Sequence, residues 1–187
     1  MIEYFTGSID DVAIFDSELS ATAIQNLYFA SSGKSLSDPV LALALSDDSG
    51  TTAADSSGHQ NNATLAGNAT WSDSVPHTTQ GDASVILDGA GSYLTVPNND
   101  AYSLSGTDFS LGFWVKFSTV KDNVGLLSED EGGGNIPKWV FNYGLISSRH
   151  LSPRHRKYSL RSKDCYLASG LSMHPLNHLE CRCNSHS

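Results

Sequence analysis

Two adjacent carboxylates near the start of the chain, Asp10 and Asp11, are the first residues whose type and spacing suggest chemistry. They lie in the run "SIDDVAIF", which has the two-residue period of a β-strand. In such a strand Asp10 shares a face with Val12 and Ile14, and Asp11 lies on the other face. A carboxylate on an apolar face is costly to bury unless a cation or several N–H donors satisfy it. We therefore expect a cation or backbone donors at Asp10, and solvent or the opposite sheet face at Asp11.

A second acidic cluster, "SEDE" at residues 128–131, suggests glycoside hydrolysis at first sight. That reaction needs two carboxyl groups held at a fixed separation by a rigid element. This cluster instead adjoins three consecutive glycines, Gly132–Gly134. We expect a solvated turn here and no catalytic site, so the chain is predicted not to be an enzyme.

Trp114 and Trp139 are candidates for carbohydrate contact, because an indole offers a flat apolar surface to a sugar ring. Sandwich cores also contain tryptophans, and packing in the core or between sheets is the favoured interpretation of both residues. The two alternatives stay open at this point.

Histidines and cysteines near the end of the chain, in "HPLNHLECRC", raise the question of zinc. His174 and His178 have a usable spacing, but Cys181 and Cys183 are closer together than the pair in a common zinc knuckle. The favoured interpretation is a tail without a metal site.

Charge is distributed unevenly along the chain. Residues 1–144 contain 4 Lys/Arg and 18 Asp/Glu, whereas residues 145–187 contain 7 Lys/Arg, 2 Asp/Glu and all three cysteines. Such a break predicts a boundary. The acidic first part is not the surface of a nucleic-acid-binding protein, and no apolar run is long enough for membrane insertion.

The elements that must position these residues are short strands punctuated by turns. The clearest strand is "FSLGFWVKF", residues 109–117, in which large apolar side chains alternate with smaller or polar ones. A helix over residues 21–29 is predicted to begin after Ser20, which can cap it. Further strands are expected in the runs "PVLALAL", "SVILDG", "SYLTVP", "VGLLSED" and "KWVFNYG". This pattern predicts an all-β fold of two packed antiparallel sheets.

Three sequence motifs together resemble the laminin-G-like branch of the concanavalin A-like lectin/glucanase superfamily. They are "DDSGTTAADSSGHQNNATLAG", "LDGAGSYLTVP" and "FSLGFWVKF". The opening stretch "GSIDDVAIFDSELSATAIQNLY" is similar to the end of such a domain. The resemblance implies an antiparallel β-sandwich jelly roll that is incomplete here, with one short helix near the N-terminus. It also implies a structural calcium, for which Asp10 and Asp55 match the family's expected ligands; the alternative is that both aspartates organise turns.

Because the motifs occur in an unusual order, we expect four segments. Residues 1–30 would be the last strand and helix of a preceding repeat, residues 31–38 a linker, and residues 39–144 the front of the next repeat. The basic Cys/His-containing tail, residues 145–187, is expected to be disordered or non-native. Alternatively, residues 1–30 complete the later repeat as a circular permutant.

The resemblance implies a non-catalytic binding or adhesion module located outside the cell or at its surface, as part of a larger multidomain protein. Its expected partner is a glycan or an extracellular protein. Two alternatives remain: a structural or adhesion spacer without glycan specificity, and an accessory module of a carbohydrate-active enzyme. Fold alone does not decide among them.

Overall fold

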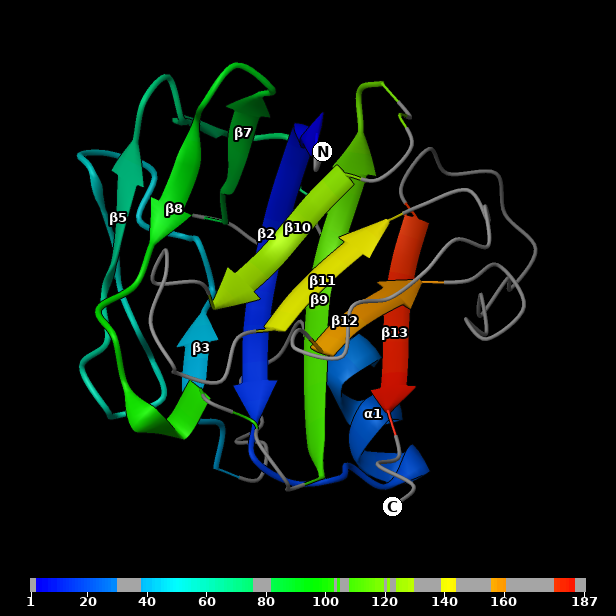
Figure 1. The fold of residues 1–187 in the computed structure, drawn as a ribbon. Helices are drawn as coiled ribbons and strands as arrows, with labels where there is room; N and C mark the ends of the chain where they lie inside the picture. Colours follow the sequence, from blue (N-terminus) through cyan, green and yellow to red (C-terminus); the bar gives the residue numbers. More distant parts are fainter. Residues whose placement is uncertain are drawn as a thin grey trace.

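A computed structural model of the 187-residue chain describes most of its first 143 residues and two later strands. The described residues are 3–29, 38–75, 82–102, 104, 108–119, 121, 124–129, 139–143, 156–160 and 177–183. Within them the fold is β-rich, mainly antiparallel and sandwich-like, as the sequence predicts (Figure 1).

The largest sheet has the strand order β13-β9-β2-β7-β6, with β3 also paired to β2. The bounds are β2 Thr6–Phe15, β3 Leu41–Leu43, β6 Thr70–Ser72, β7 Ser84–Asp88, β9 Phe109–Phe117 and β13 Asn177–Cys183. Strand β2 pairs with β9 along one edge and with β7 and β3 along the other. The N-terminal segment is therefore a central strand among later ones.

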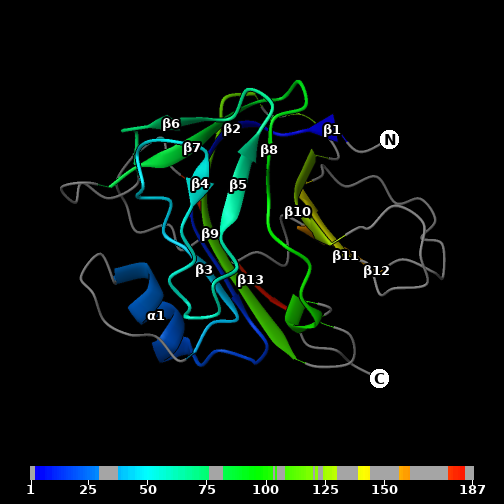
Figure 2. The same cartoon turned by 90° about the vertical axis from the view of Figure 1, so that its left-hand side faces the viewer.

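Two smaller sheets complete the sandwich-like body. One has the order β1-β10-β11-β12 and the other β4-β5-β8. The bounds are β1 Glu3–Tyr4, β4 Thr52–Ala53, β5 Ala63–Ala66, β8 Tyr93–Thr95, β10 Val124–Glu129, β11 Trp139–Tyr143 and β12 Arg156–Leu160. Figure 2 shows β10, β11 and β12 on one side of the largest sheet and the helix α1, Ala21–Phe29, on the other.

The core lies between the largest sheet and the sheet of β10 and β11. In β9 the residues at alternate positions, Phe109, Leu111, Phe113 and Val115, are all buried. The ring of Phe113 meets that of Phe141 edge-on at 5.6 Å between centroids. The alternation of apolar residues along this strand therefore predicted both its bounds and its core face correctly.

Helix α1 begins as predicted. The Ser20 hydroxyl accepts a hydrogen bond from the Ala23 N–H at 3.2 Å, and the Ser20 carbonyl accepts one from Ile24. On the way into the helix, the Leu19 N–H donates to the Ser110 hydroxyl of β9. This bond ties the helix start to the face of the largest sheet that points away from β10 and β11, which we call the outer face.

Candidate functional site on the outer face

A β-bulge in β2 decides where Asp10 lies. Asp10 pairs opposite Trp114 and Ala13 opposite Gly112, so three residue steps on β2 match two on β9. The bulge contains Asp11, whose φ is +49°. Asp10 therefore shares the outer face with Trp114. The prediction that it shares a face with Val12 and Ile14 is wrong, because the bulge turns those two residues toward the core.

The carboxyl of Asp10 is buried and incompletely hydrogen-bonded. Its Oδ1 accepts the Asp11 N–H at 2.8 Å, while its Oδ2 is buried without a hydrogen-bond partner. Only 2% of the residue is exposed. Burial, with added repulsion from the charges of Asp11 and Asp82, raises the pKa of Asp10 to about 9. This carboxyl is consequently neutral near pH 7 unless a cation replaces its proton.

A small cavity adjoins Asp10 on the outer face. Its volume is about 10 Å³, which is enough for one particle the size of a water molecule. Two hydrogen bonds connect residues that line it. The Ser84 hydroxyl donates to the Ser74 carbonyl at 2.9 Å, and Lys116 Nζ donates to the Ser74 hydroxyl at 3.4 Å. Seven residues line it, and we call six of them, all but the core residue Val115, the outer-face site: Ser8, Asp10, Ser74, Ser84, Trp114 and Lys116.

Asp55 lies in a different environment. Its carboxylate accepts four hydrogen bonds, from the N–H groups of Ala42, Ser57 and Asn61 and from the Ser57 hydroxyl, at 2.8–3.0 Å. Burial alone would raise its pKa, but these bonds outweigh burial and lower it. These hydrogen bonds are those expected of an aspartate that organises a turn.

The two predicted calcium ligands are separated by a strand. Residue Leu43 of β3 pairs with Val12 of β2 on one edge and with Asp55 on the other. The negative charges that help raise the pKa of Asp10 are those of Asp11 and Asp82. The charge of Asp55 instead helps raise the pKa of Tyr102.

The donor set of each aspartate decides whether it suits a calcium ion. The buried Oδ2 of Asp10 fits a cation, since it has an unused lone pair and two carboxylates nearby. Asp55 does not fit, because N–H and O–H donors already occupy both of its oxygens. Across the described part of the chain, the side chains include no cluster of three or more His, Cys, Asp or Glu suited to a metal ion.

The two candidate tryptophans also differ in their surroundings. Trp139 is 5% exposed, and its Nε1 donates to the Tyr102 carbonyl at 2.6 Å, so the indole packs in the core. Trp114 is half-buried on the outer face between β2 and β13. Of the two indoles, that of Trp114 is the more exposed.

Sequence reasoning missed five members of this region: Ser8, Ser74, Asp82, Ser84 and Lys116. Ser8 stands opposite Lys116, and Ser84 opposite Ser72, only because of strand register. Adjacent aspartates inside a strand were the available signal, because Asp is uncommon in strands and tolerates positive φ. That signal points to the bulge and not to the serines.

In the tail, the predicted zinc candidates are only partly described. His178, Cys181 and Cys183 lie on β13, opposite Trp114, Leu111 and Phe109 of β9. His174 lies outside the described residues, as do Asp130 and Glu131 of the "SEDE" cluster. Two stretches of the tail, β12 and β13, form strands at sheet edges.

No helix among the described residues is long and apolar enough to cross a membrane. We also compared the chain with family models, with curated proteins and with solved structures, and none of them matched.

Proposed function

We propose that the chain is a non-catalytic extracellular binding module of the concanavalin A-like jelly-roll type, and that it binds carbohydrate at the outer-face site. The observation that carries this proposal is the half-buried indole of Trp114 on a sheet face with serine hydroxyls and an ammonium group beside it. Flat apolar area beside hydroxyl and amine donors is the combination that a sugar ring requires.

The pairing of β2 with β9 brings the polar and aromatic parts together. Asp10 is directly opposite Trp114, and Ser8 is directly opposite Lys116, so each pair is about 5 Å apart at Cβ. A sugar lying on the indole would then be near Ser8 and Lys116, which are both partly exposed, whereas Ser84 is buried and supports the site from beneath. Five of the six residues, all but Ser74, lie on strands of the largest sheet, and strands hold the geometry of a site more rigidly than a loop would.

A structural calcium at Asp10 is part of the proposal. It would be held by the buried carboxylate of Asp10, with Asp11 and Asp82 contributing negative charge. Such an ion would neutralise a carboxylate that burial otherwise forces to be protonated. Asp55 is not included, because its hydrogen bonds leave no oxygen free.

Binding measurements on a glycan array, followed by calorimetry on any sugar that binds, test the carbohydrate proposal. Trp114→Ala and Lys116→Ala should each weaken binding by at least about tenfold. Lys121→Ala is the matched control, since Lys121 is an exposed lysine that does not line the outer-face site. Absence of binding to any glycan, or equal binding by Trp114→Ala, would contradict the proposal and favour a spacer module.

Thermal unfolding with and without calcium tests the ion. At saturating calcium the midpoint should rise by at least about 3 °C, since a ligand that binds only the folded state stabilises it. Asp10→Ala should abolish the shift, and Asp16→Ala, which removes an exposed carboxylate, should leave it unchanged. No shift in the unsubstituted protein would show that Asp10 does not bind calcium.

A further inference from the structure

Two identical tripeptides, Asn-Ala-Thr, lie close together in the chain. One begins at Asn62, directly before β5, and the other at Asn68, just after it. Each has the pattern Asn-x-Ser/Thr, with x other than proline, that secreted proteins use to attach an N-linked glycan. Because the three residues are the same in both, the motif does not distinguish the two asparagines. The structure does, because it gives their side chains different hydrogen bonds.

Asn62 presents its amide nitrogen to solvent. Its Oδ1 accepts the Asp55 N–H at 2.9 Å, and this bond orients the amide group. The nitrogen Nδ2 is on the other side of Cγ and has no hydrogen bond within the part of the chain that the structure describes. Asn62 and Thr64 are both exposed, whereas Ala63 between them is fully buried. The asparagine and the threonine of this motif therefore face solvent together, as alternate residues along a strand do.

Asn68 uses the corresponding nitrogen for a bond of its own. The residue is also exposed, so exposure alone does not separate the two motifs. Its Nδ2 donates to Asp88 Oδ2 at 2.8 Å, and a bond to a carboxylate is stronger than one between neutral groups. The backbone is crowded here, since a Cβ on Gly67 would lie 2.7 Å from the Gly91 carbonyl oxygen. A sugar on Asn68 would disturb a bond and a close contact that the folded state uses.

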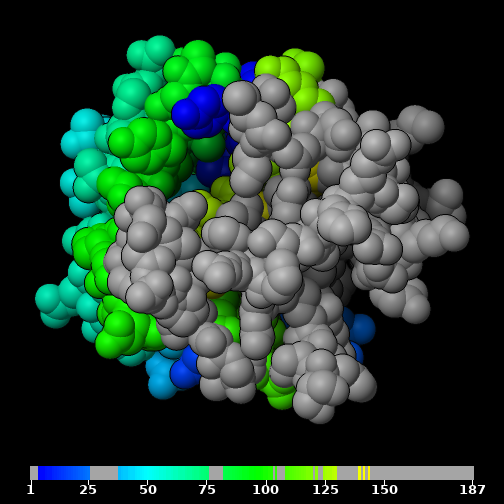
Figure 3. All heavy atoms as spheres, viewed as in Figure 1, coloured from blue at the N-terminus to red at the C-terminus, as the bar shows by residue number. Residues whose placement is uncertain are grey.

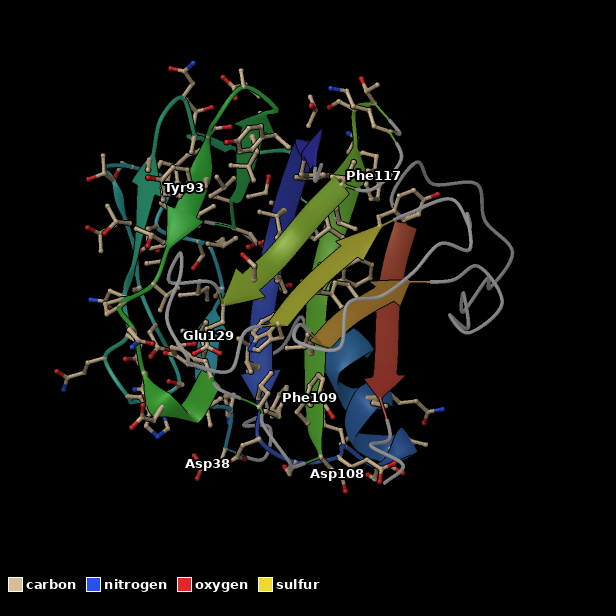
Figure 4. The ribbon with its side chains drawn as sticks, viewed as in Figure 1. Asp38, Tyr93, Asp108, Phe109, Phe117 and Glu129 are labelled. Atoms are coloured by element: carbon tan, nitrogen blue, oxygen red, sulfur yellow. The ribbon has the colours of Figure 1, made fainter. Side chains whose placement is uncertain are left out.

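The exposed face of β5 has the chemistry to border a glycan. Thr64 is opposite Thr52 of β4 and Thr95 of β8, and all three threonines are exposed. Tyr93 follows on the same face of β8 and is 53% exposed (Figure 4). Figure 3 shows the cyan and teal atoms of the segment around β4 and β5 at the left margin of the molecule. A sugar on Asn62 that extends along β5 thus meets hydroxyl groups first and then an exposed aromatic ring.

We propose that Asn62 carries an N-linked glycan and that Asn68 does not. This inference rests on the extracellular location in the proposed function. In the transfer, Asn62 Nδ2 forms a bond to the anomeric carbon of an oligosaccharide that is linked to a lipid pyrophosphate. The bond from that carbon to the pyrophosphate oxygen breaks, the lipid pyrophosphate leaves, and the amide nitrogen loses one proton. The Oδ1 of Asn62 is unchanged, so its hydrogen bond with Asp55 is kept.

Secretion of the full chain from cultured animal cells, with a cleavable signal peptide added, tests the proposal. Chains modified at Asn68 fold less stably and are depleted, so Asn62 should have at least about fivefold the occupancy of Asn68 in the secreted protein. Peptide mass spectrometry measures both occupancies. No glycan at Asn62 would overturn the proposal, and equal or higher occupancy at Asn68 would overturn the choice between the motifs.

Two matched variants remove one motif each and leave both asparagines in place. Thr64→Ala should abolish the glycan on Asn62, and Thr70→Ala should retain it; both threonines are exposed, so the circular dichroism spectrum should not change. The glycan persisting in Thr64→Ala, or its loss in Thr70→Ala, would overturn the assignment.

The outcome is separate from that of the proposed function. The host cell supplies secretion and the sugar donor, so occupancy reports on Asn62 alone. The glycan array and the Trp114→Ala variant report on ligand binding at the outer-face site. A modified Asn62 in a protein that binds no glycan would support this inference and contradict the carbohydrate proposal.

Discussion

Asp10 and Asp55 are two aspartates that the sequence assigned to one ion and the structure places in opposite situations. Asp55 sits at an exposed turn, and its four hydrogen bonds lower its pKa. Asp10 sits on a central strand, has one hydrogen bond, and its pKa is raised to about 9. The difference in donors, and not the depth of burial alone, separates the two.

The same type of side chain can stabilise the folded state in one environment and destabilise it in another. At Asp55 the carboxylate replaces the backbone partners that the turn around residues 55–61 lacks, so its charge stabilises the folded state. At Asp10 the charge has little compensation, so the folded state holds a proton there or a cation in its place. A carboxyl of the second kind is tolerated where it serves a purpose, which is why it marks the candidate site.

The largest expected effect belongs to Asp10→Asn, measured in EDTA so that no divalent ion is present. In the unfolded chain this carboxyl titrates near 3.8, and in the folded chain near 9. Between these values the folded state binds the extra proton, so stability is fully present at low pH and falls as the pH rises. The amide of the variant does not titrate, and at pH 8 the variant should be more stable than the unsubstituted protein by on the order of 5 kcal/mol.

Urea unfolding at pH 4 and pH 8 measures this difference. At pH 4 the two proteins should differ little, which makes that pH the internal control. Equal pH dependence in the two proteins would show that Asp10 is ionised in the folded state, and would remove the contrast with Asp55.

The next effect in size is that of Asp55→Ala. The substitution leaves three backbone N–H groups and the Ser57 hydroxyl without their acceptor, and should destabilise the protein by about 3 kcal/mol at pH 7. Because the pKa of Asp55 is lowered, this contribution is present above the unfolded value and is lost as the pH falls through the folded one. The two aspartates thus have opposite pH dependence.

Urea unfolding of three variants separates the hydrogen bonds from the charge. Asp55→Asn keeps one carbonyl oxygen and should lose roughly half as much stability as Asp55→Ala. Asp16→Ala removes an exposed carboxylate and should change the free energy of unfolding by less than about 0.5 kcal/mol. A loss at Asp55→Ala as small as that of the control would mean that the turn does not depend on this side chain.

Local patterns in the sequence predicted the elements well. The alternation in residues 109–117 predicted β9 with its bounds, and the Ser20 cap predicted the start of α1. The sequence did not reveal that the first long strand lies at the centre of the largest sheet, since β2 pairs with β9, which is far away along the chain. Periodicity carries no information about such partners.

The candidate site was only half predictable for the same reason. Asp10 was identified from its residue type, but the two-residue period assigned it to the wrong face, because one extra residue in a bulge reverses every later position. The charge of Asp82 and the hydroxyls of Ser74 and Ser84 come from other segments of the chain. Their arrangement follows from tertiary pairing and leaves no trace in the local pattern.

The smallest expected effect concerns a third aspartate, Asp88, which tests whether donors alone lower a carboxyl pKa without burial. Asp88 is exposed and accepts hydrogen bonds from the Ser92 hydroxyl, the Ala90 N–H and the Asn68 amide, and these lower its pKa to about 2. An NMR pH titration of its side-chain carboxyl should give that value, with the stability it contributes lost only as the pH falls toward 2. Ser92→Ala removes the first of these donors and should raise the measured pKa toward 3.8. If Asp88 titrates at its ordinary value, hydrogen-bond donors are not enough to explain Asp55, and its position beside β3 must account for the contrast with Asp10.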